Sequence, residues 1–166
     1  MPVSLPDHFR LMARYNTGAN LRLYATCAEI GDAERKRIRP AFFHSIHGTL
    51  NHILLGDRIW MARFEGGTSP STGLGADLYA EFGALRDARI AEDARIDAFG
   101  DRLDDEFLSG SISYRNNEGR DLTDPMSLLV AHFFNHQTHH RGQVHDMLTQ
   151  TGIATPVLDM HRVINP

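Results

Sequence analysis

Histidine is the residue type in this sequence best able to do chemistry, because the chain has ten of them among its 166 residues. Eight of the ten fall into two short windows. The members are His44, His47 and His52 in the first window and His132, His136, His139, His140 and His145 in the second. Imidazole is the commonest metal ligand among side chains, and it titrates near neutral pH. The clustering therefore indicates a metal site or a buried hydrogen-bond network.

The second window contains a pair with the geometry of metal ligands. His136 and His140 continue an apolar helical stripe, whose other members are Leu129, Phe133, Val144 and Met147. Residues four apart differ by roughly 40° around a helix, so these two imidazoles stack on adjacent turns and can reach one ion. Spacing alone would equally allow a pair of His132 and His136. Either pair needs a third ligand from a neighbouring helix.

The first window can supply that ligand. His52 lies on an apolar face of its own helix and could meet the pair across the core. His47 is five residues away and points roughly 140° round the helix. His44 and His47 form a rival pair near the start of the helix, where we expect exposure. The alternative to a metal is a hydrogen-bond network that uses Asn51, Asp57 or Gln143.

Several other metal chemistries are excluded by missing residues. Di-iron bundles need several carboxylates, and the last helix has only Asp146. The zinc-protease motif needs a glutamate after the first histidine, where this chain has Gln137. Cys27 is alone, so a thiolate zinc site is excluded. Three neutral imidazoles with open positions suit zinc or nickel, with iron or manganese as further choices.

The elements that must position these residues are helices. Apolar periodicity predicts four of them, at about residues 7–29, 42–64, 78–101 and 126–149. Residues 35–40 form a basic connector, and residues 111–119 are expected to form a short β-hairpin with its turn at 116–119. Asp124 and Pro125 are expected to cap the last helix. The predicted fold is all-α, an up-down four-helix bundle with a short β-hairpin before the last helix, in a single domain over residues 1–166.

Helical periodicity also predicts which residues of the third helix are buried and which are exposed. In the third helix, Leu85, Ile90, Ile96 and Phe99 are expected in the core. The charged residues of this helix are expected to form a solvated surface, namely Arg86, Asp87, Arg89, Glu92, Asp93 and Arg95. The long loops 66–75 and 108–125 are candidate walls of a pocket.

Single residues carry further expectations. Trp60 and Phe64 are interpreted as core, and Cys27 as a small buried residue. Asp57 is a candidate partner for a ligand histidine, with a surface ion pair to Arg58 or Arg63 as the alternative. Arg141 and Gln143 could anchor a substrate, although solvated or packing roles account for them equally well.

The bulk properties narrow the class of protein. A net charge of -4 argues against a basic nucleic-acid surface. The chain has no apolar run long enough to span a bilayer, and its first fifteen residues lack the apolar core of a signal peptide. A lone cysteine gives no sign of an oxidising compartment. We therefore expect a cytoplasmic protein without nucleic-acid or membrane partners.

Two segments, residues 51–60 (NHILLGDRIW) and residues 134–143 (FNHQTHHRGQ), resemble the signature segments of the DinB/YfiT-like family of metal-dependent proteins. These are not the DNA polymerase of similar name, and the resemblance covers about residues 5–152. It implies a four-helix bundle with one divalent ion, commonly nickel or zinc. It assigns His52, His136 and His140 as the ligands, in preference to His132, and implies a homodimer.

The resemblance also implies a class of reaction. A metal lowers the pKa of a coordinated nucleophile, and some relatives are bacillithiol transferases or mycothiol-dependent isomerases. We expect an enzyme that activates a thiol or water, with thiol S-transfer using a low-molecular-weight thiol as the specific hypothesis. The alternatives are a metal-dependent hydrolase and a non-catalytic, metal-stabilised stress-response protein. A fourth protein ligand, His139 or Asp57, would close the site and favour the last alternative.

Overall fold

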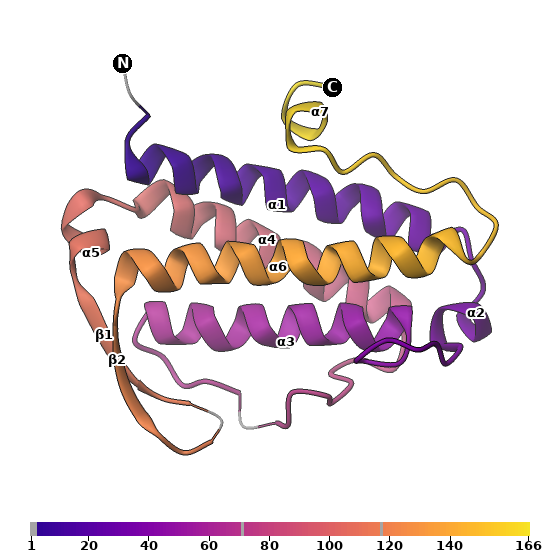
Figure 1. Cartoon of the computed structure of the whole chain (residues 1–166), viewed down its shortest axis with the longest axis horizontal. Helices are drawn as coiled ribbons and strands as arrows, with labels where there is room; N and C mark the ends of the chain where they lie inside the picture. The colour runs from indigo at the N-terminus through magenta and orange to yellow at the C-terminus, as the bar shows by residue number, and fades with distance from the viewer. Residues whose placement is uncertain (1–2, 71, 117) are drawn as a thin grey trace.

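The computed structural model describes residues 3–70, 72–116 and 118–166, and it is mostly helical (Figure 1). Four long helices lie side by side, namely α1 (Leu5–Ala28), α3 (Ile46–Phe64), α4 (Phe82–Arg102) and α6 (Met126–Thr149). The short helices are α2 (Asp32–Lys36), α5 (Asp105–Ser109) and α7 (Met160–Ile164). Within the described residues, no helix is both long and apolar enough to cross a membrane.

The helix starts follow from local capping. The Ser4 hydroxyl accepts from the backbone N–H of Asp7 at the start of α1, and the Ser45 hydroxyl accepts from that of Gly48 at the start of α3. α3 begins four residues later than predicted, because His44 has a left-handed backbone with φ of 63° and cannot continue a helix.

The β-hairpin before the last helix is confirmed. β1 (Ser111–Arg115) pairs antiparallel with β2 (Asp121–Pro125). Part of its predicted turn, Asn117, lies outside the described residues. α6 has the predicted bounds, but the prediction of an Asp124 cap is wrong. Asp124 belongs to β2 and accepts a hydrogen bond of 2.9 Å from the Tyr114 hydroxyl, while Pro125 occupies the cap position.

The connectors differ from prediction in two places. The basic connector 35–40 is partly helical, since α2 extends to Lys36. The loop predicted at 66–75, of which Ser71 lies outside the described residues, continues to Glu81, so α4 starts four residues late. α5 was not predicted, because five residues are too few for a helical period to show.

The chain does not alternate strictly in direction, so the predicted up-down order is wrong at one step. Asp57 of α3 contacts Arg89 of α4, and further along both helices Phe64 stacks on Phe99. α3 and α4 therefore run in parallel, whereas α1 and α6 run the other way (Figure 1). An extended chain covers up to about 3.3 Å per residue, against 1.5 Å in a helix, so the connection 65–81 can return along α3.

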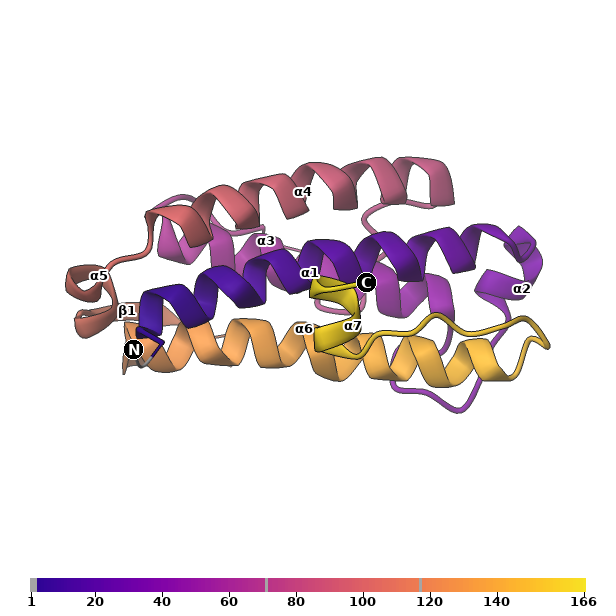
Figure 2. The ribbon, with the colours of Figure 1, turned by 90° about the horizontal axis from the view of Figure 1, so that it is seen from above.

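Two apolar clusters fill the two ends of the helical layer. One contains Phe9, Phe64, Phe99 and Phe133, and the other contains Leu23, Leu50, Leu85 and Val144. Figure 2 shows α1 between α4 and α6, which it contacts along their lengths. Between the two clusters, the helices are joined by buried polar side chains.

This polar layer contradicts the predicted exposure of α4. Arg89, Glu92 and Asp93 are only 2%, 6% and 5% exposed, and Ile90, predicted in the core, is 54% exposed. The side of α4 that carries Arg89 and Asp93 faces the other helices, because ion pairs and amide hydrogen bonds compensate the burial of charge. Helical periodicity cannot distinguish a paired, buried charge from a solvated one.

Candidate metal centre

Three histidines from two helices meet in the interior. Nε2 of His52 on α3 lies 3.1 Å from Nε2 of His136 and 3.2 Å from Nε2 of His140, both on α6. One ring nitrogen from each of the three residues lies within 4.8 Å of the others. His52 and His140 are buried and His136 is partly buried. The structure thus brings together the three predicted ligands.

The second nitrogen of two of these rings is fixed by an acceptor. Nδ1 of His52 lies 3.0 Å from the backbone oxygen of Leu74, and Nδ1 of His140 lies 2.8 Å from Oε1 of Gln143. An oxygen of this kind only accepts, so each Nδ1 carries the proton and each Nε2 is left with a lone pair. Nε2 of His52 and Nε2 of His140 therefore lie 3.2 Å apart but cannot hydrogen-bond to each other.

Burial keeps the cluster neutral. Burial, with a smaller contribution from the neighbouring imidazoles, lowers the pKa of His136 to about 3. It also lowers the pKa of His52 to about 4, although the hydrogen bond to the Leu74 carbonyl acts in the opposite direction. Burial also lowers the pKa of His140, although its hydrogen bond to Gln143 acts in the opposite direction. Neutral imidazole is the form that binds a metal, so all three rings are competent ligands near pH 7.

The arrangement fits a divalent cation. Tetrahedral bonds of about 2.0–2.1 Å from a metal to nitrogen place two ligand nitrogens roughly 3.3 Å apart, close to the observed separations. His132, His139 and Asp57 do not belong to this group. Within the described part of the chain, the group that could hold a metal ion therefore consists of three histidines.

Phe43 is a neighbour of the cluster that the sequence did not reveal. Its ring stacks on that of His52 with 3.7 Å between centroids and presents an edge to His140 at 5.5 Å. The carbonyl of Leu74 was equally unforeseen. Both lie in irregular segments, where no helical or strand periodicity predicts which side chains face the core. The position of a backbone carbonyl cannot be predicted from residue types.

A cavity of about 310 Å³ reaches His52 and His136. Its lining includes Leu74 from one long connection and Tyr114 and Leu122 from the other, so both connections form walls as predicted. The interpretation of Trp60 as core is wrong in part, because this half-buried side chain packs on the core with one side and lines the cavity with another. Phe64 is in the core, as predicted.

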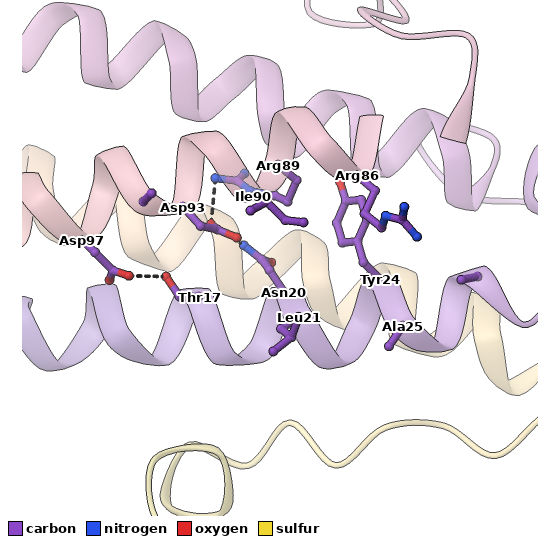
Figure 3. A pocket seen from close by; sticks show the side chains of 12 residues that line it. Thr17, Asn20, Leu21, Tyr24, Ala25, Arg86, Arg89, Ile90, Asp93 and Asp97 are labelled. Carbon is purple, nitrogen blue, oxygen red and sulfur yellow. Dashed lines mark hydrogen bonds and ion pairs between the residues drawn. The ribbon is translucent and has the colours of Figure 1, made fainter. Parts of the chain in front are cut away.

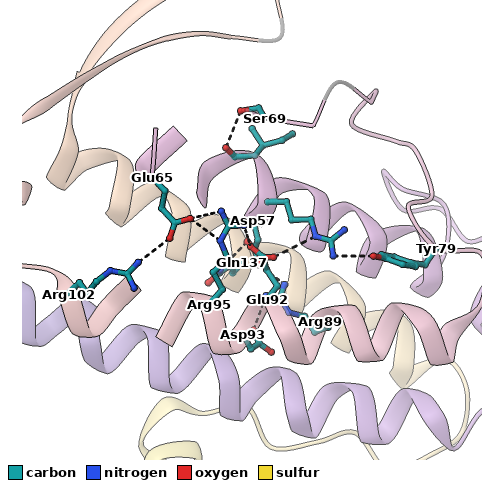
Figure 4. A network of polar contacts seen from close by, with 12 residues as sticks. Asp57, Glu65, Ser69, Tyr79, Arg89, Glu92, Asp93, Arg95, Arg102 and Gln137 are labelled. Atoms are coloured by element: carbon teal, nitrogen blue, oxygen red, sulfur yellow. Dashed lines mark hydrogen bonds and ion pairs between the residues drawn. The ribbon is translucent and has the colours of Figure 1, made fainter. Parts of the chain in front are cut away.

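Asp57 belongs to a buried polar network and makes no hydrogen bond to a histidine of the cluster (Figure 4). Its carboxylate accepts a hydrogen bond of 3.0 Å from the Gln137 amide and forms an ion pair of 2.5 Å with Arg89. Gln137 directly follows His136, and Asp57 directly follows Gly56, whose backbone faces the His136 ring. The expectation of an ion pair with Arg58 or Arg63 is wrong, because Asp57 points inward.

The remaining candidates have other roles. His47 was expected near the surface, but it is buried, and its Nε2 lies 2.8 Å from the backbone oxygen of Tyr79. Arg141 is also buried, where it donates to Asn16, so it is a packing residue rather than a substrate anchor. Burial raises the pKa of the Cys27 thiol to about 12, which makes this cysteine a poor nucleophile.

These features define a mostly helical protein with a three-histidine site at the edge of a cavity. The model of the DinB family matches residues 1–166, so the chain belongs to that family. It is similar to "Protein DinB" of Bacillus subtilis (strain 168), with 25% identity over 154 residues that cover 87% of each chain.

Proposed function

We propose that His52, His136 and His140 bind one divalent metal ion, nickel or zinc in preference to iron or manganese. One observation carries this proposal. The Nε2 atoms of His52 and His140 lie 3.2 Å apart, and the acceptors beside their Nδ1 atoms place the proton of each ring on Nδ1. Two lone pairs at that separation repel each other, and a shared cation converts the repulsion into two bonds.

We further propose that the protein is an enzyme that transfers a low-molecular-weight thiol to an electrophile. When bound, the ion lowers the pKa of a coordinated thiol or water and so supplies a nucleophile near neutral pH. The acceptors at Leu74 and Gln143 orient two of the ligand rings. The cavity beside His52 and His136 can hold the second substrate.

Two alternatives remain. A metal-dependent hydrolase would use the same centre with water as the nucleophile. A non-catalytic, metal-stabilised stress-response protein would need no cavity and no open position. The three-ligand group and the adjacent cavity favour an enzyme.

Elemental analysis of protein purified without an affinity tag tests the metal. We expect near-stoichiometric metal in the parent and its loss in His52→Ala, His136→Ala and His140→Ala. The exposed His8 serves as the control, and His8→Ala should keep the metal. Full occupancy in any of the three ligand variants would sink the proposal.

Visible spectra of the cobalt- or nickel-loaded protein test the chemistry. Titration with a thiol should shift the ligand-field bands if a coordination position is open. A spectrum that no thiol or small anion changes would favour the non-catalytic alternative. Measuring turnover of thiol acceptors and esters in parallel then separates transfer from hydrolysis.

We also propose that residues 1–166 form one four-helix bundle domain, that the protein acts in the cytoplasm, and that it is a homodimer. A groove of about 520 Å³ between α1 and α4 supports the dimer (Figure 3). Leu21 and Ile90 are 67% and 54% exposed there, and Arg86 and Asp97 lie toward opposite ends of the groove. A two-fold axis across this groove would bring Arg86 of one copy toward Asp97 of the other.

Light scattering after gel filtration tests the dimer. Ile90→Glu places a charge in the groove and should give a monomer. Leu128→Glu is a matched control, because Leu128 is 57% exposed on α6, outside the residues that line the groove. A monomeric parent, or a variant Ile90→Glu that remains a dimer, would contradict this interface.

A further inference from the structure

The cavity beside the histidine cluster has an apolar lining with a single permanent positive charge among its described residues. The apolar members are Ile59, Trp60, Leu74, Tyr114 and Leu122, and the charge is that of Arg63. Leu74 and Leu122 are 40% and 37% exposed, so part of this lining faces water. Apolar surface in a cavity gains free energy when the apolar body of a ligand covers it.

Arg63 has no ion pair among the described residues, unlike Arg58 and Arg89, which lie nearby in the helical layer. Arg58 pairs with Glu92 and Arg89 pairs with Asp57, whereas no carboxylate of the described residues lies within 4.0 Å of the Arg63 guanidinium. A guanidinium has five N–H donors. The one hydrogen bond that the structure shows for Arg63 runs from Nη2 to the backbone oxygen of Arg115, at 3.2 Å.

Two aromatic rings hold the guanidinium in place. Its Cζ lies 4.6 Å from the ring centre of Trp60 and 4.7 Å from that of Tyr114. These contacts stabilise a cation without neutralising it. Partial burial lowers the pKa of Arg63, although not enough to remove its charge near neutral pH. The Arg63 guanidinium is therefore a fixed, partly desolvated positive charge whose other N–H groups can donate to a ligand.

We propose that Arg63 binds the carboxylate of an organic acid whose apolar body fills this cavity. A planar carboxylate matches the fork of N–H donors of a guanidinium. The other end of the acid then faces His52 and His136. Within the proposed function, the electrophilic substrate is therefore an acid with an apolar segment.

The helix sets the length of that acid. The backbone of Gly56 faces His136, and Arg63 lies seven residues further along α3. Seven residues span roughly 10 Å along a helix axis. An acid whose carboxylate and reacting carbon are several bonds apart fits this separation, whereas acetate is too short to occupy both ends.

Fluorescence can test the anion site directly, because Trp60 is the only tryptophan of the chain and contacts Arg63. We would titrate the full-length protein, metal-loaded and metal-free, with 3-phenylpropionate, its neutral amide and acetate. The acid should change the emission saturably and bind at least tenfold more tightly than the amide, a difference of about 1.4 kcal/mol. Equal affinity for acid and amide in the parent would overturn the proposal.

Variants assign the charge to Arg63. Arg63→Gln should remove the preference for the acid, and Arg63→Lys should restore part of it. Arg102→Gln is the matched control, because Arg102 is exposed, pairs with Glu65 and does not line the cavity. An unchanged preference in a folded Arg63→Gln protein would contradict the proposal. If that variant does not fold, the comparison of acid and amide binding to the parent protein still tests whether the cavity prefers a carboxylate.

Two further outcomes separate this site from the metal chemistry. A preference for the acid in protein that shows no metal-dependent turnover would leave the anion site standing and end the proposed enzyme. Metal-dependent turnover without any preference for acids would support the proposed enzyme and rule out the anion site. Tighter binding of phenyl phosphate than of 3-phenylpropionate would also overturn the assignment to carboxylic acids.

Discussion

Gly56 on α3 faces the imidazole of His136 on α6 so closely that a Cβ atom at position 56 would lie 2.8 Å from Cε1 of the ring. The absence of a side chain at Gly56 thus lets the ring sit against α3, where its Nε2 meets that of His52. The glycine belongs to the site without contributing an atom to it.

Gly56→Ala should therefore displace the His136 ring and weaken metal binding at least tenfold. The helix itself should survive, since alanine favours helix formation by about 1 kcal/mol over glycine. Competition with a chromogenic chelator measures the affinity. Gly142→Ala is the control, because a Cβ at Gly142 on α6 meets nothing within 4 Å. Equal affinities in the two variants would show that the close approach is unimportant.

Gln143→Ala removes the acceptor of the Nδ1 proton of His140. Outer partners of this kind fix the tautomer and orientation of a ligand ring, and their loss typically costs about 10–100-fold in metal affinity. We expect a loss of that size with the fold intact, measured by the same chelator competition. Gln150→Ala, at the exposed end of α6, should bind metal as the parent does. A parental affinity in Gln143→Ala would argue against the assigned tautomer.

Acid should destabilise the metal-free protein through its buried histidines. The pKa values of His52 and His136 in the folded state, about 4 and about 3, lie below the ordinary 6.5. The unfolded chain therefore binds more protons in this window, and the free energy of unfolding falls as the pH drops from 6.5 toward 4. The effect is at most about 1.4 kcal/mol per pH unit and per group.

Urea unfolding at several pH values measures this effect, with His136→Gln as the comparison. Asp93 acts in the opposite direction, because burial raises its pKa to about 6 and the folded state then binds more protons between about pH 4 and 6. The difference between parent and variant cancels such contributions. A difference that does not change with pH would show that His136 is not buried in its neutral form.

Asp57→Asn should destabilise the protein by about 3–5 kcal/mol, because it breaks a buried ion pair and leaves Arg89 with less compensation. The double variant Asp57→Leu with Arg89→Met should recover part of this loss. Denaturant unfolding measures both. Asp87→Asn, whose carboxylate is exposed on the same helix as Arg89, should change stability by no more than about 0.5 kcal/mol. A loss below 1 kcal/mol for Asp57→Asn would refute the role of this pair.

Part of the fold could be predicted from the sequence because it depends on local patterns. α6 runs from Met126 to Thr149 as expected, since a long amphipathic period and the proline before it define both ends. The charges of α4 could not be placed in this way. The burial of Arg89 depends on Asp57 and Asp93, which lie on another helix and on the next turn of its own.

The sequence by itself narrowed the imidazole pairs of the last helix to neighbours four residues apart, either His132 and His136 or His136 and His140, because this spacing is a local property of one helix. Only the tertiary structure decided that His52 completes the group, that Leu74 and Gln143 orient two of the rings, and that Arg63 faces the same cavity. These relations depend on how separate helices and loops pack. No periodicity within one segment encodes the distance to another.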